Sequence, residues 1–230
     1  MTINPDQIVL FQWSWFTINS TIFFTWMVMF LLTFGSWLIT RRLSSEGPLS
    51  RWQNLLEVLV TVMKGQIREV SRQEPGPYLP FVGTLFIFIA ISNVLTIVPG
   101  YTPPTSSLST TAALAICVFI AVPVFAISRR GIMNYLKQYL EPTFFMLPFN
   151  IIGELSRTLA LAVRLYGNMM SGTVIVAILL GIAPLLFPVL MQALGLLTGL
   201  IQAYIFAILA MVYIASASQV HEDLEKKGES

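Results

Sequence analysis

The feature that most constrains this chain is a nearly uncharged run over residues 143–220. Its charged side chains are Glu154, Arg157 and Arg164. Pro184 and Pro188 are its best breaks, which predicts one helix of about 40 residues and another of about 30, near 60 and 45 Å long. Both exceed the roughly 30 Å of bilayer hydrocarbon, and ordinary tilts of about 20° do not absorb the excess. We therefore expect a long, steeply tilted helical hairpin over residues 143–219.

Composition and charge-free stretches predict the rest of the fold. Of the 230 residues, 56% are hydrophobic and 10% charged, whereas soluble domains carry about 25% charged residues. Uncharged stretches predict a first span at 18–39 and a second and third within 81–127. Segment 41–74 mixes charges with apolar residues at helical spacing, which predicts an interfacial amphipathic helix. With a short soluble tail at 220–230, residues 1–230 are expected to form a single, all-α membrane domain.

The distribution of Lys and Arg predicts how the chain crosses the membrane. They cluster after the first and third spans and are missing from the N-terminal segment and the second loop. The positive-inside rule then predicts five spans, with the N-terminus outside and the C-terminus in the cytoplasm. Clustering of this kind argues against nucleic-acid binding. Cys117 is expected to be a small core residue and His221 a surface residue, so no metal and no cofactor is expected.

Polar residues of the last two helices fall on one face of each helix. Lipid-facing positions reject polar groups, so each stripe predicts a seam that faces water or protein. The first stripe contains Asn150, Glu154, Arg157, Arg164, Asn168 and Ser171. The second contains Gln192, Gly195, Gly199, Gln202 and Tyr213. The amide of Gln202 needs partners if it is buried, and the first stripe supplies them. For the GxxxG of Gly195 and Gly199, close helix packing explains the pattern as well as a functional role does.

Arg164 is the most informative of these residues. Its guanidinium does not lose its proton in proteins, and placing it at membrane depth costs several kcal/mol. Glu154 and Arg157, three residues apart, could be a simple ion pair near the cytoplasmic end, and the sequence leaves that open. Arg164 lies seven residues deeper, with no acid within helical reach. We expect its counter-charge to come from another subunit.

The motifs LAVRLYGNMMSG and, further on, IQAYIFAILAMVYIASA resemble subunit a of the rotary F-type ATP synthases. PTSSLSTTAAL, at 104–114, is similar to a Pro-Thr segment of that family. The resemblance covers most of the chain from Asn54 onward. It implies a stator in an energy-coupling membrane, most simply the bacterial inner membrane. The stator would face a ring of c subunits with ion-binding carboxylates and would contact peripheral-stalk b subunits and lipid.

The same resemblance implies roles for individual residues. Arg164 corresponds to the family's essential arginine, which favours the ionised form of a passing carboxylate, expels its ion and separates two aqueous half-channels. Asn168 and Gln202 match the polar neighbours of that arginine. The other residues placed on the ion pathway are Glu154, Arg157, Gln192, Thr173, Ser107, Ser109 and Tyr213.

Departures from the family pattern bear on the ion. Many proton-using members have a Glu or a His at the positions of Thr173 and Gly195, and the family's Asp and Asn in the Pro-Thr segment are Ser107 and Ser109 here. The exit side then offers hydroxyls and amides without an acid. Oxygen dipoles suit sodium, a hard cation. The sequence therefore favours sodium over protons as the coupling ion, and both ions stay open as alternatives.

Two other functions compete with this interpretation. A secondary transporter usually has internal repeats, and none is found in this chain. A purely structural membrane subunit would not need Arg164. The sequence has no phosphate loop and no nucleophile with a base. We therefore expect a non-catalytic subunit, with ATP chemistry in its partners.

Overall fold

The computed structural model describes residues 9–13, 16–41, 51–71, 74–98, 100–133, 146–182 and 187–219. Its elements are β1 Val9–Trp13, β2 Phe16–Asn19, α1 Ser20–Thr40, α2 Arg51–Ser71, α3 Leu79–Val94, η2 Leu95–Ile97, η3 Pro104–Ser106, α4 Leu108–Arg130, α6 Met146–Ile182 and α7 Phe187–Gln219. Over this part of the chain, five segments are long and apolar enough to cross a bilayer: α1, α3 with η2, α4, α6 and α7. The predicted five-span helical fold is confirmed.

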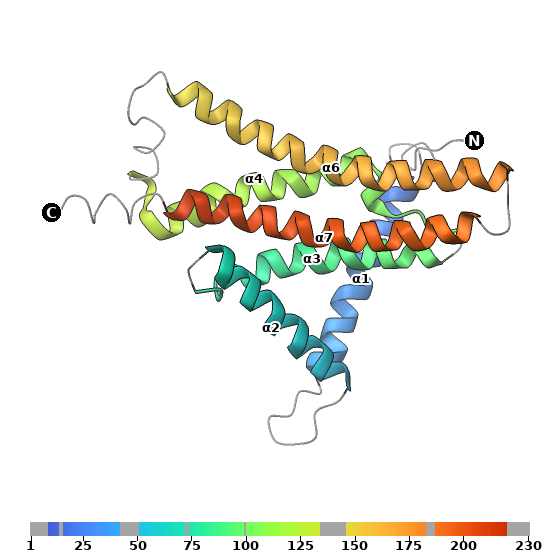
Figure 1. Ribbon diagram of the computed structural model, residues 1–230, viewed down its shortest axis with the longest axis horizontal. Coiled ribbons are helices and arrows are strands. Elements are labelled where there is room, and N and C mark those ends of the chain that lie inside the picture. Colours follow the sequence, from blue (N-terminus) through green and yellow to red (C-terminus); the bar gives the residue numbers. More distant parts are fainter. Residues whose placement is uncertain are drawn as a thin grey trace.

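The helices α3, α4, α6 and α7 run side by side along the long axis of the molecule (Figure 1), and α7 packs against the other three. Small residues on the buried face of α7 let these helices approach closely; they include Ala203, Ala207, Ala210 and Ala215. Phe206 and Met211 fill the space between them. The amphipathic α2 packs on α7 and α3, and α1 leaves the bundle at a large angle. The core therefore lies around α7.

The two last helices form the hairpin expected from the sequence. They contain 37 and 33 residues and pack against each other. Pro188 is the second residue of α7, where a proline is tolerated because its missing N–H would have no helical partner. Pro184 and the tail at 220–230 lie outside the described residues. The tilt of the hairpin in the bilayer and the single-domain division stay predictions. We call the end of the bundle at Ile182 and Phe187 the turn end.

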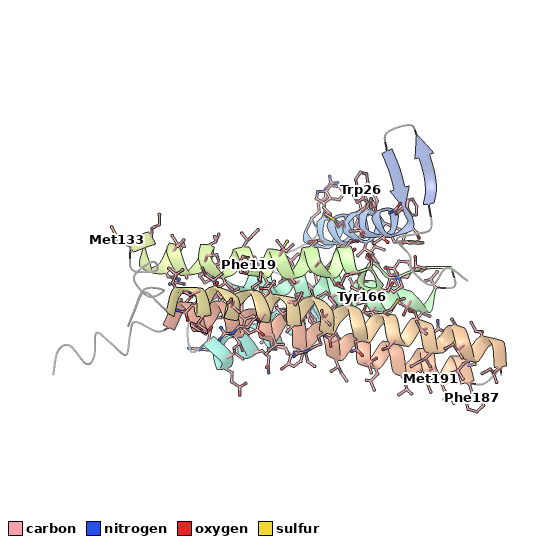
Figure 2. All side chains as sticks on the ribbon, turned by 90° about the horizontal axis from the view of Figure 1, so that it is seen from above. Trp26, Phe119, Met133, Tyr166, Phe187 and Met191 are labelled. Carbon is pink, nitrogen blue, oxygen red and sulfur yellow. The ribbon has the colours of Figure 1, made fainter. Side chains whose placement is uncertain are left out.

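Burial differs sharply between the two hairpin helices. In the most hydrophobic 18-residue window of α7 39% of residues are buried, as in that of α3, whereas in that of α6 the share is 11%. Side chains such as Phe187 at the turn end and Trp26 on α1 project from the outside of the bundle (Figure 2). One side of α6 is therefore left uncovered by the described residues.

Two local features differ from the sequence prediction. Residues before α1 form an antiparallel hairpin of β1 and β2, in which Trp13 pairs with Phe16. Aromatic and β-branched residues favour this strand pairing, which the all-helical prediction missed. The expectation of a buried Cys117 is wrong, since its side chain is exposed. An apolar run in a membrane helix has lipid-facing positions that are as hydrophobic as its core, so hydropathy did not distinguish them.

Asn93, buried near the end of α3, joins α3 to α7. Its Nδ2 donates to the carbonyl of Gly199 at 2.8 Å, and its Oδ1 accepts from Thr105 Oγ1 at 2.9 Å. A Cβ built on Gly199 would lie 3.1 Å from Asn93 Cβ and Nδ2, whereas one on Gly195 would meet nothing within 4 Å. The close approach predicted for the GxxxG is therefore found at Gly199, where a side chain approaches, and not at Gly195.

Replacing Gly199 by alanine should destabilise the protein. The added methyl forces Asn93 away from α7 and weakens two buried hydrogen bonds, an overpacking cost of about 1–3 kcal/mol. The measurement is the apparent unfolding temperature of the purified complex in detergent. Gly195→Ala, four residues earlier on the same helix, is the matched control and should leave that temperature unchanged. Equal stability of the two variants would contradict this packing.

Candidate functional site

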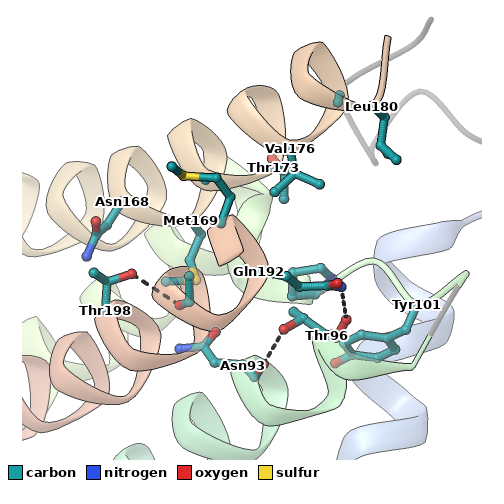
Figure 3. A pocket seen from close by; sticks show the side chains of 15 residues that line it. Asn93, Thr96, Tyr101, Asn168, Met169, Thr173, Val176, Leu180, Gln192 and Thr198 are labelled. Atoms are coloured by element: carbon teal, nitrogen blue, oxygen red, sulfur yellow. Dashed lines mark hydrogen bonds between the residues drawn. The ribbon is translucent and has the colours of Figure 1, made fainter. Parts of the chain in front are cut away.

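A cavity of about 280 Å³ lies toward the turn end, between α6, α7, the end of α3 and the loop after it (Figure 3). It is large enough for several water molecules. Four residues singled out in the sequence line it together: Asn168, Thr173, Gln192 and Gly195. The positions of Thr173 and Gly195 thus open onto one space. No Asp, Glu or His is found among the described residues that line it.

The threonine hydroxyls around this cavity donate their protons to helix carbonyls. Thr173 Oγ1 donates to Met170 O at 2.9 Å, and Thr198 Oγ1 lies 3.0 Å from Leu194 O. Thr96 Oγ1 donates to Asn93 O at 2.6 Å. A hydroxyl has one proton and two lone pairs. With the proton directed at the backbone, each hydroxyl is left to act as an acceptor toward the cavity.

The side-chain amides of Asn168 and Gln192, which also line the cavity, likewise donate to other protein atoms. Gln192 Nε2 donates to the carbonyl of Thr96 at 3.1 Å, which ties α7 to η2. Asn168 Nδ2 donates to Gln202 Oε1 at 3.3 Å. The amide oxygens of Asn168 and Gln192 are then left as acceptors. The lining is mainly apolar, and its polar groups are these acceptor oxygens together with the second N–H of each amide.

Gln202 is 3% exposed and sits on α7 facing α6. Its contact with Asn168 confirms that the stripe on the first hairpin helix supplies a partner for it. Its Nε2 has no hydrogen-bond partner within the described segments. A buried amide nitrogen of this kind needs an acceptor, so the Nε2 group of Gln202 has N–H donors to spare.

Arg164 lies four residues before Asn168 on α6, about 6 Å along the helix axis. Its side chain is exposed, and it has no ion-pair or hydrogen-bond partner among the residues described. Its exposed neighbours on the same face are small: Ala160, Gly167 and Ser171. A permanent cation thus stands on a face of α6 that another helix could approach closely.

The remaining predicted residues lie in two other places. Toward the start of α6, Arg157 lies over the ring of Tyr213 on α7, 5.8 Å from its centroid. Glu154, one turn earlier, is half-buried, and its carbonyl accepts from Thr158 Oγ1 at 3.0 Å. Ser107 and Ser109 lie at the start of α4, with their hydroxyl oxygens 2.6 Å apart. Neither of these serines lines the cavity.

Four polar residues of the cavity were not singled out from the sequence: Asn93, Thr96, Tyr101 and Thr198. Asn93 had a usable signal, because an amide inside an apolar span is expensive unless it is bonded. Thr96 and Thr198 had none, since threonines are tolerated in membrane helices. Tyr101 belongs to the loop before η3, whose path the sequence did not predict.

Fold and site together define a polytopic helical membrane protein with a cavity that holds several polar side chains and an exposed arginine that has no partner among the described residues. The sequence model of the family described as ATP synthase A chain matches residues 22–215. The chain is 62% identical to "ATP synthase subunit a 2" of Acaryochloris marina over 96% of this chain and 95% of that protein. It is 58% identical to "ATP synthase subunit a" of Albidiferax ferrireducens over 100% of this chain and 99% of the relative. The chain therefore belongs to the ATP synthase A chain family, as its motifs indicated.

The Asn168–Gln202 contact should appear as a coupling free energy. In a double-mutant cycle with Asn168→Ala and Gln202→Ala, the two destabilisations should be less than additive by about 0.5–1.5 kcal/mol. The measurement is unfolding of the detergent-solubilised subunit for wild type, both single variants and the double variant. Strict additivity would mean that the two amides do not interact.

Proposed function

We propose that this chain is the ion-pathway stator of a rotary F-type ATP synthase, and that Arg164 is the residue on which coupling depends. The observation that carries the proposal is a guanidinium at membrane depth, exposed on α6, without an anionic partner in the described part of the chain. A charge there is too costly for a scaffold. It is explained if a partner delivers a carboxylate to it.

The proposed partner is the ring of c subunits. The uncovered side of α6, with small residues around Arg164, suits helices that slide past in close contact. An arriving carboxylate next to a fixed positive charge has its pKa lowered and gives up its bound ion. After the ring has turned, the carboxylate moves away from Arg164 and can bind an ion again. Peripheral-stalk b subunits and lipid would cover other surfaces of the chain.

The cavity at the turn end is the proposed half-channel on the outer side of the membrane. Arg129 and Arg130 end α4 at the opposite end of the bundle, and the positive-inside rule then supports a cytoplasmic location for that end. The N-terminus is then outside, and the membrane is the bacterial inner membrane. Asn168 connects this cavity to Arg164 within one helical turn. Glu154, Arg157 and Tyr213 lie toward the cytoplasmic end and belong to the second half-channel.

Sodium is the coupling ion that this cavity suits best. Its threonine hydroxyls and amide oxygens act as acceptors, since each hydroxyl proton and one N–H of each amide are directed at other protein atoms. Such oxygens can replace part of a cation's hydration shell. Protons would have to pass on water alone, because no carboxylate or imidazole lines the described cavity. Ser107 and Ser109 would support the nearby loop.

Arg164→Ala should abolish gradient-driven ATP synthesis while the complex still assembles. Arg164→Lys should fail as well, because a compact ammonium can lose its proton when desolvated and lacks the planar fork of arginine. The measurement is ATP synthesis in proteoliposomes, with subunit content checked on the purified complex. Normal synthesis by the alanine variant would mean that the chain is only structural. Normal synthesis by the lysine variant would mean that charge alone suffices.

ATP hydrolysis by the purified coupled complex should rise with sodium concentration at a fixed high pH. High pH keeps protons scarce, so that sodium must occupy the ring if it is the coupling ion. Hydrolysis by the detached catalytic sector is the control and should not respond to sodium. Hydrolysis independent of sodium, with proton pumping intact, would overturn the assignment of the ion and leave the role of Arg164 standing.

A further inference from the structure

Asn93 is the point at which three parts of the chain meet. It is 1% exposed, lies near the end of α3 and lines the cavity at the turn end (Figure 3). Its Nδ2 donates to Gly199 O of α7 at 2.8 Å, and its Oδ1 accepts from Thr105 Oγ1 of η3 at 2.9 Å. Because a buried amide is costly unless it is bonded, these two contacts hold α3, α7 and η3 in one arrangement.

A second hydrogen bond joins α7 to the same region, seven residues before Gly199. Gln192 Nε2 donates to Thr96 O of η2 at 3.1 Å, and Thr96 Oγ1 donates to Asn93 O at 2.6 Å. At 100° per residue, Gln192 and Gly199 lie on one face of α7, about 20° apart and about two turns apart along the axis. Two bonds at different heights of one face fix both the rotation and the axial position of a helix. We call the Asn93–Gly199 and Gln192–Thr96 bonds the α3 clamp.

The η3 side of this arrangement is anchored on α1. Thr102, in the loop that leads to η3, shares a hydrogen bond with Ser20 at 3.1 Å. The ring of Tyr101 packs edge-on against Phe24, with the ring centroids 4.9 Å apart. Tyr101 also lines the cavity, so this loop forms part of the cavity wall. The segment that bonds Asn93 is therefore itself held in place.

The α3 clamp also determines where Gln202 points. Gln202 follows Gly199 by three residues, which places it about 60° around α7 and about 4.5 Å along the axis. Gly199 faces α3, and Gln202 faces α6, where its Oε1 accepts from Asn168 Nδ2 at 3.3 Å. This distance exceeds the usual upper value of about 3.2 Å for such a bond. The contact therefore tolerates little further displacement of α7.

We propose that Asn93 is the positioning residue for the Asn168–Gln202 pair, and that it acts through the backbone of Gly199. The side-chain surface of a helix lies about 5–6 Å from its axis, so a rotation of α7 by about 10° moves the Gln202 amide by about 1 Å. Such a shift breaks a contact that already measures 3.3 Å. Neither side-chain bond of Asn93 goes to the pair itself, so its influence on the pair is indirect.

The consequence for coupling rests on the proposed function. Asn168 lies about one helical turn from Arg164, so the pair forms part of the polar surroundings in which a ring carboxylate would meet the arginine. A displaced pair changes those surroundings, and a carboxylate can then pass Arg164 without exchanging its ion. ATP hydrolysis would continue while fewer ions are pumped.

The first test measures the coupling between Asn168 and Gln202 in two backgrounds of the full-length chain. In the native chain, the double-mutant cycle with Asn168→Ala and Gln202→Ala should give a coupling factor of about two- to twelvefold in the unfolding equilibrium constant. In an Asn93→Ala background the factor should fall to about one. Tyr204→Phe is the matched control. It removes another hydrogen bond of α7, the one to Gln66 Oε1 of α2 at 2.7 Å, and should leave the factor unchanged.

A coupling factor that survives in the Asn93→Ala background would overturn the inference, because the pair would then hold without the clamp. A merely structural role of Asn93 would lower the stability of every variant equally and leave the factor intact. If Asn93→Ala yields no folded protein, Gln192→Leu takes its place. That variant keeps the bulk of the side chain but loses the bond to Thr96 O. It should also lower the factor, and an unchanged factor would overturn the inference equally.

The second test is made on the whole complex in proteoliposomes and measures ions pumped per ATP hydrolysed. Asn93→Ala should lower this ratio severalfold, and Tyr204→Phe should keep it. Adding Asn93→Ala to Gln202→Ala should lower the ratio no further than Gln202→Ala alone, since Asn93 acts through Gln202. A normal ratio in Asn93→Ala, or effects that multiply in the double variant, would overturn the inference. A normal ratio in Arg164→Ala would instead overturn the proposed function, and the coupling factor of the pair would still test the clamp.

Discussion

A positive charge that cannot be neutralised, carried on an apolar helix, is the constraint on which the rest of this structure depends. The guanidinium of Arg164 needs either water or an anion, and the described chain gives it no anion. The helix that carries it is also less buried than α3, α4 and α7. The asymmetry between α6 and α7 follows, since α7 is packed on several sides while α6 keeps one side open for a partner.

Local hydrogen bonding decides what the cavity can hold. Threonine in a membrane helix commonly donates to a carbonyl three or four residues back. At Thr173 and Thr198 this bond removes the donor and leaves the acceptor. The amides of Asn168 and Gln192 each direct one N–H at another protein atom and keep their oxygens as acceptors. The cavity thus offers several acceptor oxygens, with no ionised side chain among the described residues that line it.

Sequence reasoning was strongest where two helices had to meet. The five spans, the amphipathic helix and the hairpin followed from charge and length, and the Asn168–Gln202 contact followed from the need of a buried amide for a partner. It failed at Cys117, because hydropathy does not separate lipid-facing from buried positions. It also could not place Tyr101, whose position depends on a loop bounded by prolines and on contacts with α1.

The attachment of α1 has a consequence for how the chain is made. Its contacts with the loop come from its first turns, through Ser20 and Phe24, and large residues further along it, such as Phe30 and Trp37, stay more than half exposed. Thr102 follows Ser20 by 82 residues, so α1 enters the bilayer well before its docking partner has been synthesised. A helix whose backbone hydrogen bonds are all internal is stable in lipid before it packs against other helices. The last step in closing the cavity wall would then be a docking event between preformed helices.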